Sequence, residues 1–158
     1  MKQYESIHLV KGEDLNHHGT LFAARAASWF VESGFAAAAC EHGNPDEIVL
    51  RSLQNMSFSV PVEKGAVVAF RSRAAYAGRT SLVVHIEAAD AISGTVAVEG
   101  FITFVTIDKE TRQKKPHGVV LDETTDEKEL EQRRRAWELS QDRGISNRTE
   151  RSDQSHEV

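Results

Sequence analysis

The apolar residues follow a helical pattern early in the chain. Residues 20–41 contain no proline, are rich in alanine and are followed by Gly43 and Pro45. Because alanine is the best helix former and proline cannot continue a helix, this stretch predicts a helix of about twenty residues with Thr20 as its N-cap. Its apolar residues spread around most of the circumference, which predicts that the helix is buried on most sides.

The pattern changes to that of β-strands between Glu47 and Ile107. Runs of valine, isoleucine, phenylalanine and threonine are separated by turns that contain glycine, which is typical of an antiparallel sheet. One strand is expected to begin at 48–50, and further strands to cover 56–60, 66–76, 80–88 and 95–107. Residues 96–105 are apolar on both faces, so we expect the helix on one side of this strand and a partner subunit on the other.

A second, peripheral helix is predicted at about 125–141, where few residues are apolar. The expected local contacts are a capping box and two ion pairs one turn apart: Thr124 with Glu127, Glu129 with Arg133, and Glu131 with Arg135. Residues 142–158 are polar and are expected to be disordered. The ordered part is therefore expected to be one domain over residues 1–141.

Composition narrows the class of protein. The chain has 158 residues, which suits one domain, and 40% of them are hydrophobic. A net charge of -5 and a pI of about 5.8 argue against a nucleic-acid partner. Cys40 is the only cysteine, which excludes an intramolecular disulfide and a cysteine-based metal site. No signal peptide or membrane span is visible, so we expect a cytoplasmic protein without a membrane partner.

A long early helix followed by an antiparallel sheet that wraps around it is an α+β arrangement, the hotdog fold. One helix cannot cover a sheet of this size. The remaining apolar face and the strand edges therefore predict a homodimer at least. The sequence leaves a dimer, a tetramer and a hexamer open.

Residues 14–32, DLNHHGTLFAARAASWFVE, resemble the signature of hotdog acyl-CoA thioesterases. In that family an Asn-x-x-Gly loop precedes Thr-Leu-Phe-Gly-Gly, and a helix with Trp-Met-Asp-Glu-Ala-Gly follows. Further similar segments are 56–58, 61–62, Gly65, 78–81 and 100–107, so the resemblance covers residues 5–140. It implies hydrolysis of an acyl-CoA to the free acid and CoA at a site shared between subunits. No cofactor is implied, because CoA is part of the substrate.

The resemblance assigns roles to the loop and to the start of the helix. The family's Gly-Gly pair, whose N–H groups polarise the thioester carbonyl, corresponds to Ala23 and Ala24. Alanine keeps the N–H donor, so Ala24 can hold the oxyanion. Asn16 matches the asparagine that places substrate or water, although a loop asparagine also commonly bonds its own turn. Gly19 and Thr20 would border the substrate.

The same loop carries two histidines. His17 and His18 are candidate bases, because an imidazole group commonly serves as a base near neutral pH, and His18 is assigned to substrate binding. Two exposed loop histidines are the competing interpretation. No further clustered histidine or cysteine supports a metal site, so no metal is expected. A hotdog hydratase would need a histidine with an acidic partner, and no such pair lies in this segment.

Val31 stands where the family has its catalytic aspartate. Valine is neither base nor nucleophile. Glu32 lies about 100° further round the helix and is the candidate general base. Two alternatives remain open. Glu32 can form an ion pair across the subunit interface with an arginine (Arg25, Arg71 or Arg73), or the protein binds acyl-CoA or an acyl-carrier thioester without hydrolysing it.

Residues 79–81 match a family loop near the CoA-binding groove. Arg79 would meet a CoA phosphate, and the Thr80 and Ser81 hydroxyls would position water. An ordinary hairpin turn is the competing interpretation. The basic run 133–135 is interpreted as the cationic half of a helix rather than a phosphate site.

Overall fold

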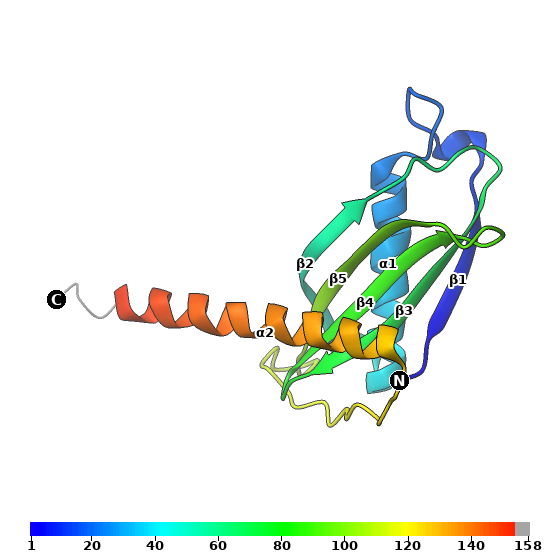
Figure 1. Cartoon of the computed structure of the whole chain (residues 1–158). Coiled ribbons are helices and arrows are strands. Elements are labelled where there is room, and N and C mark those ends of the chain that lie inside the picture. Colours follow the sequence, from blue (N-terminus) through cyan, green and yellow to red (C-terminus); the bar gives the residue numbers. More distant parts are fainter. Residues whose placement is uncertain (154–158) are drawn as a thin grey trace.

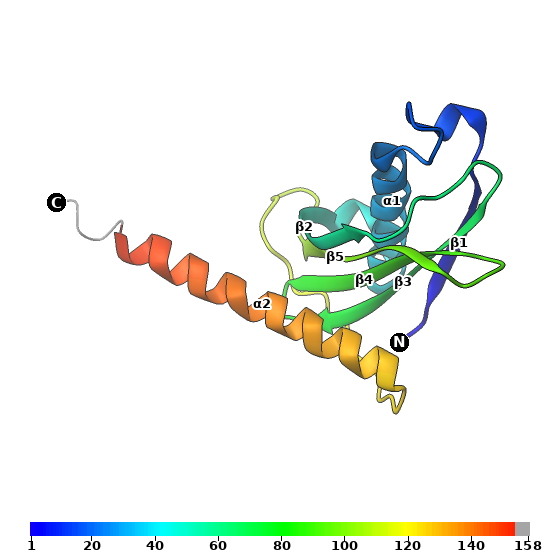
Figure 2. The ribbon, with the colours of Figure 1, turned by 45° about the horizontal axis from the view of Figure 1, so that its top comes forward.

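The computed structural model describes residues 1–153, with side chains to Asp142. Five antiparallel strands form one sheet in the order β1-β3-β4-β5-β2. Helix α1 lies on one face of the sheet and α2 on the other (Figure 1, Figure 2). The hotdog fold is thus confirmed. The elements are β1 Tyr4–Leu9, α1 Ala23–His42, β2 Ile48–Phe58, β3 Val67–Ala77, β4 Ser81–Asp90, β5 Val96–Thr106 and α2 Glu127–Asp153.

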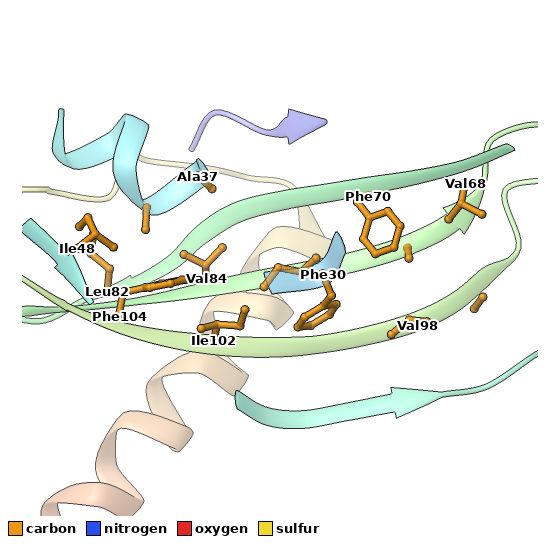
Figure 3. Packing of buried hydrophobic residues seen from close by; sticks show 14 of the residues in the cluster. Phe30, Ala37, Ile48, Val68, Phe70, Leu82, Val84, Val98, Ile102 and Phe104 are labelled. Carbon is orange, nitrogen blue, oxygen red and sulfur yellow. The ribbon is translucent and has the colours of Figure 1, made fainter. Parts of the chain in front are cut away.

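The main core lies between α1 and the sheet. Phe30 is fully buried among Val98, Ile102 and other aliphatic side chains of the strands (Figure 3). Burial of one such side chain stabilises the fold by about 1.5–3 kcal/mol. Gly34 allows close approach, because a Cβ there would lie only 2.9 Å from Cδ1 of Ile102. The opposite side of α1, including Ser28, is exposed in the single chain, so the helix is buried on one side rather than on most sides.

The N-cap of α1 is Phe22, and the prediction of Thr20 was wrong. Thr20 is extended and forms an isolated antiparallel bridge with Glu63, so its backbone belongs to the preceding loop. The C-terminus follows the sequence more closely. Gly43 adopts the left-handed conformation, with φ of 87°, and donates its N–H to the Ala39 carbonyl at 2.7 Å.

The edge strands differ most from expectation. The two short strands predicted around residue 50 and at 56–60 are one strand, β2, whose pairing with β5 shifts between Gln54 and Ser57. Asn55 takes a positive φ of 52° at this bulge. On β5, a Cβ at Gly100 would lie 2.8 Å from the Met56 Cα, so glycine allows the bulged strand to pass. Strand β1 was not predicted at all.

The second face of the sheet is covered by α2 of the same chain, where we had expected a partner subunit. Ala136 packs on Ala75, Val83 and Phe101. Most of the other contacts are polar. Arg73 bonds Glu129 at 2.8 Å, and the other pairs between the helix and the sheet are Arg135 with Glu99 and Lys128 with Glu87.

The ends of α2 also differ from the prediction. Asp126, not Thr124, accepts the Glu129 N–H at 2.7 Å and caps the helix. The Glu129–Arg133 pair is confirmed at 2.8 Å, whereas Glu131 pairs with Arg134 because Arg135 turns to the sheet. The helix continues to Asp153, so the predicted end near 141 was wrong. Residues 154–158 of the expected disordered tail lie outside the described residues. Neither α1 nor the described part of α2 is long and apolar enough to cross a membrane.

Candidate active site at the start of helix α1

Backbone hydrogen bonds to two other segments hold the residues that lead into α1. Phe22 donates its N–H to the Asp14 carbonyl, and Leu21 donates to Val62, both at 2.8 Å. The N–H groups of Ala23 and Ala24 form no hydrogen bond within the described part of the chain. Two free donors therefore stand at the positive end of the helix dipole, which suits an anionic oxygen.

Asn16 closes its own turn. Its Oδ1 accepts the N–H groups of His18 at 2.9 Å and Thr20 at 3.2 Å, and its Nδ2 donates to the Thr20 Oγ1 at 3.1 Å. Gly19 takes a φ of 79° in this turn, a conformation that glycine adopts without strain. In the single chain the Asn16 side chain thus bonds its own turn, as the second interpretation of this residue expected. His17 and His18 are exposed, with ring centroids 3.8 Å apart.

A cavity of about 300 Å³ opens beside this turn. Asn16 and Ala23 line one part of it, and the rest is mostly apolar: Leu21, Ala26, Phe58, Ser59, Val60, Pro61, Val62 and Val98. A second cavity of about 220 Å³ shares the 60–62 segment. An apolar pocket beside free N–H donors can accommodate an acyl group whose carbonyl oxygen faces the helix.

Val31 and Glu32 lie on different sides of α1. Val31 is half-buried and packs on the core, on the same side as Phe35 one turn later, whose ring meets Phe104 of β5. Glu32 is exposed and lies nearer β1. Burial lowers the pKa of His8 on β1, and the negative charge of Glu32 opposes this shift. In this conformation Glu32 therefore does not occupy the place of the missing aspartate.

The arginines considered as partners of Glu32 are paired elsewhere within the chain. Arg25 Nε lies 3.2 Å from the Asp14 carboxylate. Arg71 bonds Glu5 at 2.8 Å, and Arg73 bonds Glu129 on the α2 side of the sheet. Among the described residues, none of these arginines forms an ion pair with Glu32.

Residues 79–81 are remote from Asn16 in one chain. They form the β3–β4 turn, in which the Gly78 N–H donates to the Ser81 carbonyl at 2.9 Å. This turn lies at the end of the sheet opposite the start of α1 (Figure 1). A helix of 20 residues spans about 30 Å. The two groups of predicted site residues can therefore form one site only if different subunits supply them.

Two histidine–acid pairs were missed by the sequence analysis. His42 Nε2 lies 2.6 Å from the Glu47 carboxylate, and His85 Nε2 lies 2.8 Å from Glu99. Hydrogen bonds from Lys115 and His42, together with their charges, lower the pKa of Glu47 and outweigh the opposing effect of burial. The His42 pair lies at the C-terminal end of α1, and the His85 pair lies under α2. Among the described residues, no cluster of three or more such side chains suits a metal ion.

Comparison with known proteins decides the family. The model of the thioesterase superfamily matches residues 18–97 of this chain. The chain belongs to the thioesterase superfamily. This confirms the resemblance noted in the sequence. No curated protein matches the chain.

Three solved structures show how far the likeness of this thioesterase-superfamily member extends. An acyl-CoA hydrolase from Staphylococcus aureus, in complex with butyryl coenzyme A, coenzyme A and coenzyme A disulfide, is 22% identical with a TM-score of 0.77, covering 98% of this chain and 94% of that one. An acyl-CoA hydrolase from Bacillus cereus is 24% identical with a TM-score of 0.76, covering 99% and 94%. An apo-hexameric acyl-CoA thioesterase is 25% identical with a TM-score of 0.69, covering 95% and 92%.

Proposed function

We propose that this protein is an acyl-CoA thioesterase, which hydrolyses an acyl-CoA to the free acid and CoA. The observation that carries the proposal is the start of α1, where Ala23 lines an apolar cavity of about 300 Å³ and the N–H groups of Ala23 and Ala24 are free. Donors fixed at a helix N-terminus stabilise the oxyanion of a tetrahedral intermediate, and the cavity excludes water from the acyl chain. Membership of the thioesterase superfamily supports the same chemistry.

In the proposed reaction, water attacks the thioester carbonyl carbon while a base takes a proton from the water. The carbonyl oxygen becomes an oxyanion that accepts the Ala24 N–H. When the tetrahedral intermediate collapses, the C–S bond breaks and the CoA sulfur leaves with a proton. Asn16, which lines the cavity, would orient the substrate or the water. Glu32 is our candidate base, and it needs a rotamer that turns away from His8 to act.

The second subunit would complete the site. Strand β2 is an unpaired edge with exposed apolar side chains: Val49, Leu53 and Phe58 are 41–51% exposed. Antiparallel pairing of two β2 strands about a two-fold axis near Leu53 would bury this edge. It would also bring the Asn16 end of one subunit next to the 79–81 turn of the other. We therefore propose a homodimer with shared sites as the functional unit.

A second candidate function is binding of acyl-CoA without hydrolysis. The Staphylococcus aureus enzyme has been characterised with alanine at an asparagine and at an aspartate fifteen residues later. Here the same spacing leads from Asn16 to Val31, which carries no titratable group. The orientation of Glu32 towards His8 favours this candidate as well.

Thiol release from a panel of short- to long-chain acyl-CoAs tests both candidates. We expect Glu32→Gln to lower kcat by at least 100-fold if Glu32 is the base, while Glu41→Gln, the other carboxylate of α1, serves as the matched control. A wild type that binds acyl-CoA but does not hydrolyse it, and that gains activity on Val31→Asp, supports the binding candidate. A protein that neither hydrolyses nor binds acyl-CoA contradicts both.

A further inference from the structure

The segment between β2 and β3 separates two cavities near the start of α1. It crosses the end of the sheet at which α1 begins (Figure 1). The cavity of about 300 Å³ beside Asn16 and the second cavity, of about 220 Å³, have three lining residues in common, which are consecutive: Val60, Pro61 and Val62. The two cavities are therefore neighbours, with this segment as the wall between them.

The wall is anchored at both ends by its backbone. The Ser59 N–H donates to the Ala97 carbonyl, and the Val62 carbonyl accepts the Leu21 N–H, both at 2.8 Å. Val60 lies between these anchors and is 41% exposed. Its side chain is packed less tightly than the core and can change rotamer while the backbone stays in place.

The apolar part of the second cavity continues the main core. Val68 and Ala97 line this cavity and are buried in the core, and Ala66 packs against them. Val98 has the same place in the first cavity. Both cavities thus open onto the apolar layer between α1 and the sheet, which suits a hydrocarbon chain that runs from one to the other.

Two carboxylates border the second cavity, at Glu63 and Asp90. Hydrogen bonds from the N–H groups of Ser93 and Ile92, at 2.7 and 2.9 Å, lower the pKa of Asp90, so its carboxylate is charged near neutral pH. A neutral chain end can therefore lie in this cavity, whereas a further anionic group would be repelled.

We propose that the two cavities hold one acyl chain, which enters from the start of α1, passes Val60 and ends in the second cavity. This inference rests on the proposed function and names its substrate class, acyl-CoAs with a long, uncharged hydrocarbon chain. An apolar cavity of about 150 Å³ holds a six-carbon ring, so the first cavity holds at most about twelve chain carbons and the second about eight more. Short chains fill only the first cavity, and long chains occupy both.

Thiol release from butyryl-, octanoyl-, lauroyl- and palmitoyl-CoA, each below its micelle concentration, tests chain length. Each methylene that leaves water raises kcat/KM by up to about fourfold, so we expect kcat/KM to keep rising from lauroyl- to palmitoyl-CoA. In Ala66→Leu the larger side chain occupies the second cavity, and the palmitoyl-to-butyryl ratio of kcat/KM should fall at least about tenfold. Ala91→Leu makes the same change at an exposed position that lines neither cavity and should keep the wild-type ratio.

Val60 tests the passage between the cavities. Val60→Ala widens the passage and should raise the palmitoyl-to-butyryl ratio about threefold, whereas Val60→Phe narrows it and should lower the ratio by a similar factor. These variants also keep the test decisive if Ala66→Leu does not fold, because Val60 lies outside the core.

A terminal carboxylate tests where the chain ends. The mono-CoA thioester of hexadecanedioic acid has the chain length of palmitoyl-CoA, and its kcat/KM should be at least about tenfold lower because its free carboxylate would approach Glu63 and Asp90. Glu63→Gln should reduce this difference about threefold, since it removes one of the two charges. An unchanged difference in Glu63→Gln overturns the placement of the chain end in the second cavity.

The outcomes separate this inference from the proposed hydrolysis. If kcat/KM stops rising before lauroyl-CoA, or if Ala66→Leu affects all chain lengths alike, the inference is overturned and the thioesterase proposal stands. If no acyl-CoA is hydrolysed, hydrolysis is refuted, and calorimetric titration with the same acyl-CoAs decides the inference. A preference for palmitoyl-CoA that Ala66→Leu removes then supports one acyl site over both cavities, and equal affinities for all chain lengths overturn it.

Discussion

Asp14 fixes the loop that presents the start of α1, and its removal should loosen that end of the helix. The side chain is buried, and its Oδ2 accepts the Lys11 N–H at 2.9 Å. Its Oδ1 lies 3.2 Å from Nε of Arg25. The Asp14 carbonyl accepts the N–H of Phe22, the N-cap of α1, at 2.8 Å. Asp14 therefore connects the loop to the two free N–H groups of the proposed oxyanion site.

The two interactions of the carboxylate differ in expected size. A hydrogen bond from a backbone N–H to a charged group contributes about 1.5–3 kcal/mol. The ion pair with the half-exposed Arg25 contributes about 0.2–1 kcal/mol, because solvent screens it. Asp14→Ala removes both, so we expect a loss of about 2–3 kcal/mol in the free energy of unfolding. Asp14→Asn keeps an acceptor for Lys11 and should cost about 1 kcal/mol or less, as should Arg25→Gln.

Urea unfolding followed by circular dichroism measures these differences, with thiol release from acyl-CoA as the functional assay. We expect kcat/KM to fall at least about tenfold in Asp14→Ala, since small displacements of positioning groups reduce rates strongly. Asp14→Asn and Arg25→Gln should keep most of the activity. Equal destabilisation by the alanine and asparagine variants would show that the charge, rather than the hydrogen bond to Lys11, holds the loop. A change below about 0.5 kcal/mol in Asp14→Ala would refute the whole assignment.

Two further predictions concern the rest of the fold. Burial raises the pKa of Glu129, but the Met1 amino group and Arg133 outweigh this and lower it from 4.5 to about 2. Because the folded pKa lies below the unfolded one, this stabilisation is complete above about pH 4.5 and is lost as the pH falls towards 2. The urea midpoint of Glu129→Gln should therefore depend less on pH across this range than that of wild type. An equal pH dependence in both proteins would contradict this role of Glu129. Gly100→Ala should lower the free energy of unfolding by about 1–3 kcal/mol through the clash with Met56, and an unchanged or higher urea midpoint would contradict the close packing.

Much of the fold follows from sequence because its signals are local. The alanine-rich run that ends before Pro45 predicted α1, and the apolar runs between glycine turns predicted β3, β4 and β5. Strand β1 was missed because six residues carry little periodicity, and their partners on β3 are 58–68 residues away in sequence. The sequence analysis divided β2 into two strands for a related reason. Its bulge at Asn55 depends on Gly100 of another strand, which is a tertiary contact.

The candidate site also has features that the sequence predicts and features that only the structure shows. The family motif around Asn16, the alanines at the start of α1 and the loss of the aspartate at Val31 are visible in sequence, because they lie within one short segment. Only the tertiary structure shows that Asn16 bonds its own turn and that Glu32 faces β1.

The distance between the two groups of predicted site residues also depends on the tertiary structure. The fold separates residues 79–81 from the Asn16 turn by the length of α1 (Figure 1). The physical reason is the range of the interactions. Helix propensity, turns and short motifs depend on residues within a few positions of each other. Side-chain direction and cross-strand neighbours depend on how distant segments pack.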